Sequence, residues 1–171
     1  HLEAIMKVNK FPVKFSRAAN VYGEGQQLYR IIPKTILKIL KNEKLFLHGS
    51  GSSRRSFVHI NDISKGYLKI LKKGKIGESY HLSDKNFISI KELTMKICSK
   101  LNVDYEKYIV EKKEDRLGKD FIYKLNSKKI FEELGWRATI SLDSGIDNTI
   151  IWIKQNLSKF KLQNLEYIHK K

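Results

Sequence analysis

Two short stretches of the chain combine residue types that suit a phosphorylated ligand. One is Asp115-Arg-Leu-Gly-Lys-Asp120 with the following Tyr123, and the other is Arg17-Ala-Ala-Asn-Val-Tyr-Gly23. A guanidinium group can form two parallel hydrogen bonds to a phosphate. Glycine lets the backbone approach a ligand closely. Together the two stretches predict a site for an anionic small molecule.

The arginines near these stretches have two interpretations, and the sequence leaves both open. Asp115 and Asp120 either neutralise Arg116 or orient it toward a ligand. Arg54 and Arg55 directly precede an expected strand, where each either binds a phosphate or forms a surface ion pair.

Asn20 follows an expected strand and two small residues, Ala18 and Ala19. Small side chains leave room for a flat ring, and the asparagine amide offers both a donor and an acceptor. The simpler interpretation is that Asn20 satisfies the backbone of its own loop. That interpretation is favoured when the residue is considered alone.

Length and composition indicate one folded domain. The 171 residues are 41% hydrophobic and 11% aromatic, which favours a globule with a core over a disordered chain. The single Cys98 excludes a disulfide framework, and its place on an apolar helix face predicts burial. No apolar run has the length of a membrane span and no signal-peptide pattern opens the chain, so we expect a cytoplasmic protein.

The net charge of +16 raises the possibility of a nucleic-acid-binding module. The lysines are spread along the whole chain and alternate with apolar residues, which favours a solvated surface, and the nucleic-acid module is kept as an alternative. His48, His59 and His81 lack the spacing of metal ligands, and no metal site is predicted.

Hydrophobic periodicity predicts an α/β fold of short strands separated by helices. Strands are expected at 11–16, 45–47, 57–60 and around 80–82, with a loop after the first strand through Gly25. Helices are expected at 2–8, from Pro33, after a cap at Asn61 or Asp62, from a Ser89–Glu92 capping box, at 127–134 with Gly135 as the C-terminal cap, and at 142–157. The helix after residue 60 is expected to bury Ile63, Tyr67, Leu68 and Leu71.

The order of these segments resembles the C-terminal half of extended short-chain dehydrogenases/reductases that act on nucleotide sugars, most closely the dTDP-glucose 4,6-dehydratases. The matching motifs are Arg17–Gly23, His48-Gly-Ser-Gly-Ser-Ser-Arg-Arg-Ser-Phe-Val-His-Ile-Asn-Asp62, Gly77–Tyr80, Asp115–Asp120 with Tyr123, and Leu134-Gly-Trp136. The resemblance implies an NAD(P)-binding Rossmann-type fold whose N-terminal Gly-rich cofactor half is absent. It assigns 1–32 to the end of the Rossmann-type domain and 33–157 mainly to a small mixed α+β substrate-binding domain, with short segments returning to the Rossmann-type part. A Lys-rich tail, expected to be frayed, follows at 158–171.

The resemblance also implies site residues for a nucleotide-diphosphate sugar: Asn20, Arg30, Phe46, His48, Arg55, Arg116 and Tyr123. In this set Asn20, Arg55 and Arg116 would hold the diphosphate, and Arg30 would lie near the nucleotide. Phe46 and His48 would flank the base, and Tyr123 would support the loop of Arg116. Ala18 and Ala19 would lie near the nicotinamide of NAD.

The resemblance places the chemistry outside this chain. The family's Tyr-x-x-x-Lys pair precedes the matched region, so no catalytic residue is assigned here and the chain alone is not expected to be active. The implied parent is a homodimeric NAD-dependent dehydratase that removes water from dTDP-glucose to give a 4-keto-6-deoxy sugar. A UDP-sugar 4-epimerase or decarboxylase of the same superfamily is the alternative parent.

Overall fold

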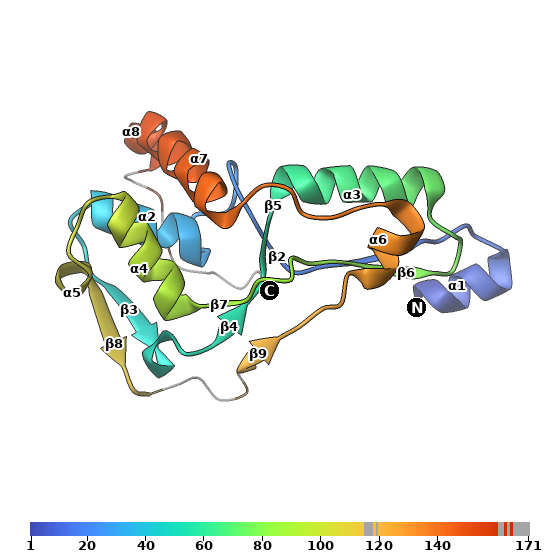
Figure 1. Ribbon diagram of the computed structural model, residues 1–171, viewed down its shortest axis with the longest axis horizontal. Helices are drawn as coiled ribbons and strands as arrows, with labels where there is room; N and C mark the ends of the chain where they lie inside the picture. Colours follow the sequence, from blue (N-terminus) through green and yellow to red (C-terminus); the bar gives the residue numbers. More distant parts are fainter. Residues whose placement is uncertain (115–117, 119, 161–162, 164, 166–171) are drawn as a thin grey trace.

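The computed structural model describes residues 1–114, 118, 120–160, 163 and 165 and has an α/β fold (Figure 1). The helices are α1 Leu2–Asn9, α2 Ile31–Leu40, α3 Ile60–Lys73, α4 Ile90–Lys100, α5 Tyr105–Tyr108, α6 Lys128–Leu134, α7 Leu142–Gln155 and α8 Leu157–Phe160, with a 3-10 turn at Gly49–Gly51. The strands are β1 Phe15–Ala18, β2 Asn20–Tyr22, β3 Leu45–His48, β4 Arg54–Arg55, β5 Phe57–His59, β6 Ser79–Leu82, β7 Ile88–Ser89, β8 Ile109–Lys112 and β9 Ile122–Tyr123.

The described strands pair mostly in parallel. β1 pairs with β6, β2 with β5 and β3 with β8, while β4 lies between antiparallel β7 and parallel β9. Only Ala19 separates β1 from β2, so one extended segment pairs first with β6 and then with β5. The segment ends where its backbone turns away at Gly23, beside the first turn of α3.

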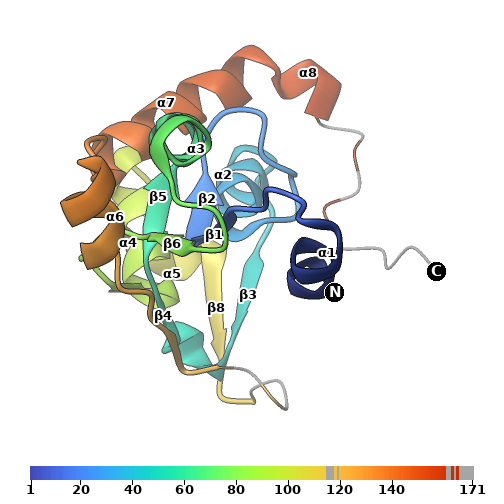
Figure 2. The same ribbon diagram turned by 90° about the vertical axis from the view of Figure 1, so that its right-hand side faces the viewer.

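A first apolar cluster fills the space between α2, α4 and α7 (Figure 2). Its fully buried members include Ile36, Leu37, Leu93, Ile97 and Ile146. Cys98 belongs to this cluster, and burial raises the pKa of its thiol to about 11, which confirms the predicted small buried hydrophobe.

A second apolar cluster lies where α3 and α6 cover β5 and β6. Val58, Ile63, Tyr80, Leu82 and Trp136 are almost completely buried in it. The two clusters flank the continuous segment formed by β1 and β2. The division of the chain into 1–32, 33–157 and 158–171 stays a prediction.

Several expected elements differ from those of the structure. Strand pairing starts at Phe15 rather than Phe11, because a tight turn closes first with the Val13 amide donating to the Phe11 carbonyl at 2.9 Å. The expected loop after the first strand contains β2, whose partner β5 lies far along the chain. His59 is the N-cap of α3, because its ring accepts the Asn61 amide; neither Asn61 nor Asp62 has that role.

The buried face of α3 also differs from the expectation. Tyr67, Leu68 and Leu71 are 45%, 54% and 69% exposed, although Ile63 is buried as predicted. The helix instead turns Gly66 toward the sheet, where a Cβ atom would lie 2.1 Å from Leu82 and 2.9 Å from Trp136. Close approach at a glycine therefore overrides the apolar periodicity of the helix.

Several described residues of the C-terminal tail pack against the rest of the chain. Helix α8 covers Leu157–Phe160, and Leu165 is buried against the first cluster, so the expectation of a frayed tail is wrong at these residues. Within the described part of the chain, no helix has the length and apolar character needed to cross a bilayer.

We expect the exposed apolar surface formed by Leu71 of α3 and Ile76, just after this helix, to cause self-association. β1 pairs with β6 on one side, and no described strand pairs with its other edge, which lies near the exposed Leu71 and Ile76. Open edges beside apolar side chains promote pairing between chains. Sedimentation velocity should show association of the wild-type chain and a shift toward monomer in Leu71→Lys/Ile76→Lys. Ile151→Lys, at an exposed residue of α7, should leave the distribution unchanged; an unchanged Leu71→Lys/Ile76→Lys variant would contradict the prediction.

Candidate functional site

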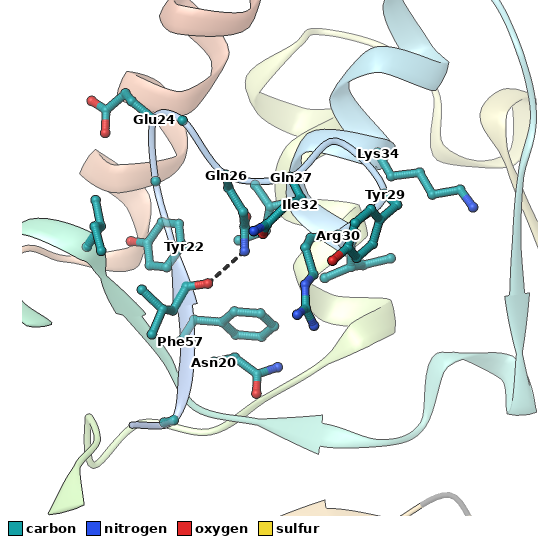
Figure 3. A pocket seen from close by; sticks show the side chains of 16 residues that line it. Asn20, Tyr22, Glu24, Gln26, Gln27, Tyr29, Arg30, Ile32, Lys34 and Phe57 are labelled. Carbon is teal, nitrogen blue, oxygen red and sulfur yellow. Dashed lines mark hydrogen bonds between the residues drawn. The ribbon is translucent and has the colours of Figure 1, made fainter. Parts of the chain in front are cut away.

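A pocket of about 960 Å³ lies between β2, the loop after it and the start of α2 (Figure 3). This volume suits a nucleotide-sized ligand. The pocket runs along the parallel β2–β5 pair, from Asn20 and Phe57 at the first residues of the two strands to the loop that follows β2. Its lining residues are Ala19, Asn20, Val21, Tyr22, Gly23, Glu24, Gly25, Gln26, Gln27, Tyr29, Arg30, Ile31, Ile32, Lys34, Phe57 and Ile60.

Glycine and glutamine shape the loop that forms one wall of the pocket. Gly23 has φ 141° and Gly25 has φ 81°, both in the region that side chains disfavour. The Gln26 side-chain amide donates to the Val21 carbonyl at 2.7 Å, and the Gln26 backbone amide donates to the Gly23 carbonyl at 3.3 Å. These bonds fold the loop back onto β2, as the dashed line in Figure 3 shows.

Arg30 is the cation that projects into this pocket. It is the N-cap residue of α2, so its backbone is extended while the helix starts immediately after it. Its guanidinium group lies 5.3 Å from the centre of the Tyr29 ring, and Figure 3 shows it directed toward Asn20. The N-terminal end of α2 adds partial positive charge, and Lys34 lines the same pocket one turn later.

Asn20 is the first residue of β2, and its side chain lines the pocket opposite Arg30 (Figure 3). Its backbone amide donates to the Ser56 carbonyl at 3.1 Å, so the β-pairing already satisfies that group. The Asn20 side chain thus lines the pocket, and its role as a ligand contact stays a prediction. An amide and a guanidinium group facing one cavity suit an anionic or polyhydroxylated ligand.

Ala18 and Ala19 are located where β1 passes into β2. Ala18 is half-buried, and Ala19 is 8% exposed and lines the pocket. Ala18 does not line the pocket, whereas the small side chain of Ala19 leaves space at the edge of the pocket for a flat ring such as nicotinamide. The sequence contains no Gly-x-Gly-x-x-Gly turn for the phosphates of a dinucleotide.

Arg55 lies outside the pocket, on β4. Its guanidinium group donates to the backbone carbonyls of Arg54 at 2.8 Å, Asp120 at 2.7 Å and Phe121 at 3.3 Å. The β4–β9 register places Arg55 opposite Tyr123, whose side chain is 41% exposed. In this arrangement Arg55 connects the segment before β9 to β4, and Tyr123 lies opposite it in the register. The predicted support of the Arg116 loop by Tyr123 stays a prediction.

Phe46 and His48 occupy a third position, on β3. Phe46 is half-exposed, and the Lys112 ammonium group of β8 lies 4.8 Å from the centre of its ring. His48 pairs in register with Lys112. Neither side chain lines the pocket that contains Asn20 and Arg30. The remaining predicted residue, Arg116, lies outside the described residues.

The structure therefore brings together some of the predicted residues and adds others. Ala19, Asn20 and Arg30 meet in one pocket, which also contains Glu24, Gln26, Gln27, Tyr29 and Lys34. Sequence reasoning missed these five residues. The i, i+4 spacing of Arg30 and Lys34 on a helix start was the available signal for a second cation. No sequence signal pointed to Gln26 and Gln27, because only the fold of the loop places them in the pocket lining.

Comparison with known proteins relates the chain to sugar-nucleotide enzymes. Residues 1–83 match the model of the NAD dependent epimerase/dehydratase family. The dTDP-D-glucose 4,6-dehydratase of Homo sapiens is 35% identical over 156 residues, covering 89% of this chain and 44% of the relative. A trifunctional enzyme of Arabidopsis thaliana that includes UDP-glucose 4,6-dehydratase is 32% identical, covering 85% of this chain and 21% of that protein.

Solved structures show the same relation. A dTDP-glucose 4,6-dehydratase from Streptomyces venezuelae, solved with NAD bound, superposes with a TM-score of 0.86 at 30% identity. The superposition covers 91% of this chain and 48% of the chain of the Streptomyces enzyme. A UDP-glucose 4-epimerase from Thermotoga maritima has a TM-score of 0.84 at 24% identity, which shows a shared fold only. The chain thus spans about half the length of the curated dehydratases that it matches.

Proposed function

Because residues 1–83 belong to the NAD dependent epimerase/dehydratase family, we propose that the chain supplies the nucleotide-sugar-binding part of an NAD-dependent sugar-nucleotide 4,6-dehydratase. The relatives named dTDP-glucose 4,6-dehydratase support this activity for the whole enzyme. The chemistry is assigned to the half of the enzyme that carries the cofactor. When bound, NAD accepts a hydride from the sugar and returns it.

The pocket between β2 and α2 is the observation that carries this proposal. Arg30 and Lys34 supply positive charge, and Asn20 and Gln27 supply amide groups. Tyr29 and Phe57 add flat apolar surfaces. A pocket that is mainly uncharged, with a few convergent polar groups and two cations, suits a diphosphate that links a base to a sugar.

The remaining predicted contacts extend the proposed site beyond this pocket. Arg55 with Tyr123, and Phe46 with His48, lie on β4, β9 and β3. We assign Arg55 and Arg116 to the diphosphate, and Phe46 and His48 to the base. A homodimeric parent and a cytoplasmic location stay predictions.

Uridine is the second candidate for the nucleotide. The support is the Arabidopsis relative whose activities include UDP-glucose 4,6-dehydratase. Thymine differs from uracil by one methyl group, and a methyl group in an apolar pocket is worth only about 1–3 kcal/mol. Parallel titrations with thymidine diphosphate and uridine diphosphate distinguish the two nucleotides.

Replacing Arg30 with alanine is expected to weaken binding of thymidine diphosphate about tenfold or more, because a charge-assisted hydrogen bond contributes roughly 1.5–3 kcal/mol. Isothermal titration calorimetry of the 171-residue chain measures the change. Arg30→Lys should retain part of the affinity, since the charge remains but the planar fork is lost.

Arg137 provides the matched control for this titration. It is exposed and does not line the pocket, so Arg137→Ala removes the same charge without touching the site. Arg137→Ala should bind within about twofold of wild type, since it removes only a distant, screened charge. Equal affinities of wild type and Arg30→Ala, or no binding of either diphosphate by the wild-type chain, would overturn the proposed function.

A further inference from the structure

A buried imidazole lies directly behind the pocket wall, and the proposed ligand contacts do not use it. His59 ends β5 and has a fully buried side chain. The β2–β5 register places it beside Tyr22, and the two rings meet edge to face with centres 5.4 Å apart. His59 therefore lies under the point where β2 gives way to the pocket loop, defined as residues 23–26.

The hydrogen bonding of His59 fixes which nitrogen carries its proton. The Asn61 backbone amide donates to Nδ1 at 3.3 Å. In a neutral imidazole, an Nδ1 that accepts leaves the proton on Nε2. Nε2 is thus a buried donor that points toward the pocket loop.

Glu24 of the pocket loop is the group that meets this donor. Its Oε2 lies 3.1 Å from Nε2 of His59, and its side chain is 38% exposed. The N–H···O alignment is too poor for a well-formed hydrogen bond, so the contact is mainly electrostatic. The approach requires Gly23, because a Cβ there would lie 2.8 Å from Ile60 and 3.1 Å from Nε2.

The direction of Glu24 matters for the charge of the pocket. Glu24 is the single carboxylate among the pocket-lining residues, all of which are described, and Arg30 and Lys34 are the cations. Figure 3 shows its side chain at the top of the loop, directed away from the space between Asn20 and Arg30. A carboxylate that turned into this space would pair with Arg30 and repel an anionic ligand.

We propose that His59 is a positioning residue that holds the Glu24 carboxylate behind the pocket loop and so keeps negative charge out of the anion-binding space. This role for the ligand rests on the proposed function, whereas the contact between His59 and the loop does not. Tethering the loop and directing the charge are two separate consequences, and each can be measured.

The tether is tested by amide hydrogen exchange of the pocket loop. Glu24→Ala and His59→Phe should each speed exchange at residues 23–26 roughly three- to tenfold, as expected for one lost polar contact. The double variant should match either single variant, since both remove the same contact. Unchanged exchange in Glu24→Ala, or additive effects in the double variant, would overturn the tether. Glu132→Ala, an exposed carboxylate on α6, is the matched control and should show no change in the loop.

The tautomer of His59 gives a second measurement that needs no ligand. Nitrogen-15 NMR of the wild-type chain should show the proton on Nε2, and Glu24→Ala should shift the Nε2 signal more than the Nδ1 signal. A proton on Nδ1 would overturn the proposal. Glu24 is on an exposed loop, so this variant is expected to fold even if His59→Phe does not.

The charge effect is tested with thymidine diphosphate. His59→Phe should lower its affinity about three- to fivefold, since one released charge costs about 1 kcal/mol at contact in water. Adding Glu24→Gln to His59→Phe should restore the affinity, and Glu24→Gln alone should not reduce it. A purely structural role for His59 predicts no rescue. If the wild-type chain binds no diphosphate while the exchange and NMR results hold, the proposed function fails and the positioning role stands.

Discussion

An Asp62→Ala variant is expected to unfold with a free energy about 3 kcal/mol below that of wild type, as expected for a buried, hydrogen-bonded charge. Asp62 lies in the first turn of α3 and is 1% exposed. Its carboxylate accepts the Thr139 amide at 2.7 Å, the Thr139 hydroxyl at 2.8 Å and the Ile140 amide at 2.8 Å. Replacing the Asp62 carboxylate with a methyl group leaves these three donors without their acceptor, at the place where α3 meets the segment before α7.

Urea denaturation followed by circular dichroism measures this loss. Asp147→Ala is the matched control, because Asp147 is half-exposed and pairs with Lys100 on the surface. Asp147→Ala should lower the free energy of unfolding by less than about 1 kcal/mol, which is the usual contribution of an exposed ion pair. Equal losses in the two variants would show that the network around Asp62 does not hold the fold together.

The contribution of Asp62 should also depend on pH. Burial raises the pKa of this carboxyl, but the hydrogen bonds from Ile140 and Thr139 outweigh it and lower the pKa below its usual value. A lowered pKa in the folded state means stabilisation that is complete above the unfolded pKa of about 3.9 and is lost as the pH falls through the folded value. The difference between wild type and Asp62→Ala should therefore stay constant from about pH 5 to 8 and shrink in acid. A difference that persists unchanged in acid would contradict this.

Gly145→Ala is expected to destabilise the chain by about 3 kcal/mol, at the upper end of the range for overpacked cores. A Cβ at this position would lie 2.1 Å from the Tyr22 hydroxyl oxygen and 2.7 and 2.8 Å from two ring carbons. Tyr22 is 1% exposed and packs against Phe57 and His59, so the ring has little room to move. In an open helix the same substitution would stabilise by about 0.5–1 kcal/mol, so the sign of the effect is diagnostic.

The same denaturation experiment measures the effect of Gly145→Ala. Ser144→Ala, one residue earlier on α7, should change stability by no more than about 0.5 kcal/mol, because its side chain is exposed. Tyr22→Phe removes the closest atom, so the Tyr22→Phe/Gly145→Ala double variant should lose less than the sum of the single losses. Additive losses would mean that Gly145 does not contact Tyr22. Because Tyr22 precedes the pocket loop, Gly145→Ala should also weaken binding of thymidine diphosphate.

The sequence correctly predicted helix caps that depend on neighbouring residues alone. The Ser89–Glu92 capping box is present with both of its hydrogen bonds. Gly135 ends α6 with φ 61°, as the C-terminal cap requires. Each of these features depends only on residues within one turn, so the order of the residues was sufficient to predict them.

Signals that depend on a partner element failed or stayed open. The prediction of the buried face of α3 was wrong, because Gly66 determines which side of the helix approaches Leu82. The spacing of Tyr67 and Leu71 does not determine it, and both side chains are exposed. The sequence predicts a loop where β2 forms, because the three residues of β2 are extended only through pairing with β5. Arg55 could not be assigned a partner, because its three acceptors are backbone carbonyls that any sequence provides.

The sequence by itself determined the residue types of the site: small residues before Asn20, an arginine at position 30, and glycines in the connecting loop. These types predict an anionic ligand that the backbone approaches closely. Only the tertiary structure decided which of them share a pocket, because parallel pairing places Asn20 of β2 beside Phe57 of β5, and the loop after β2 and the start of α2 complete the lining. It also decided that Glu24 meets His59, since that contact depends on a strand register between residues distant in the sequence.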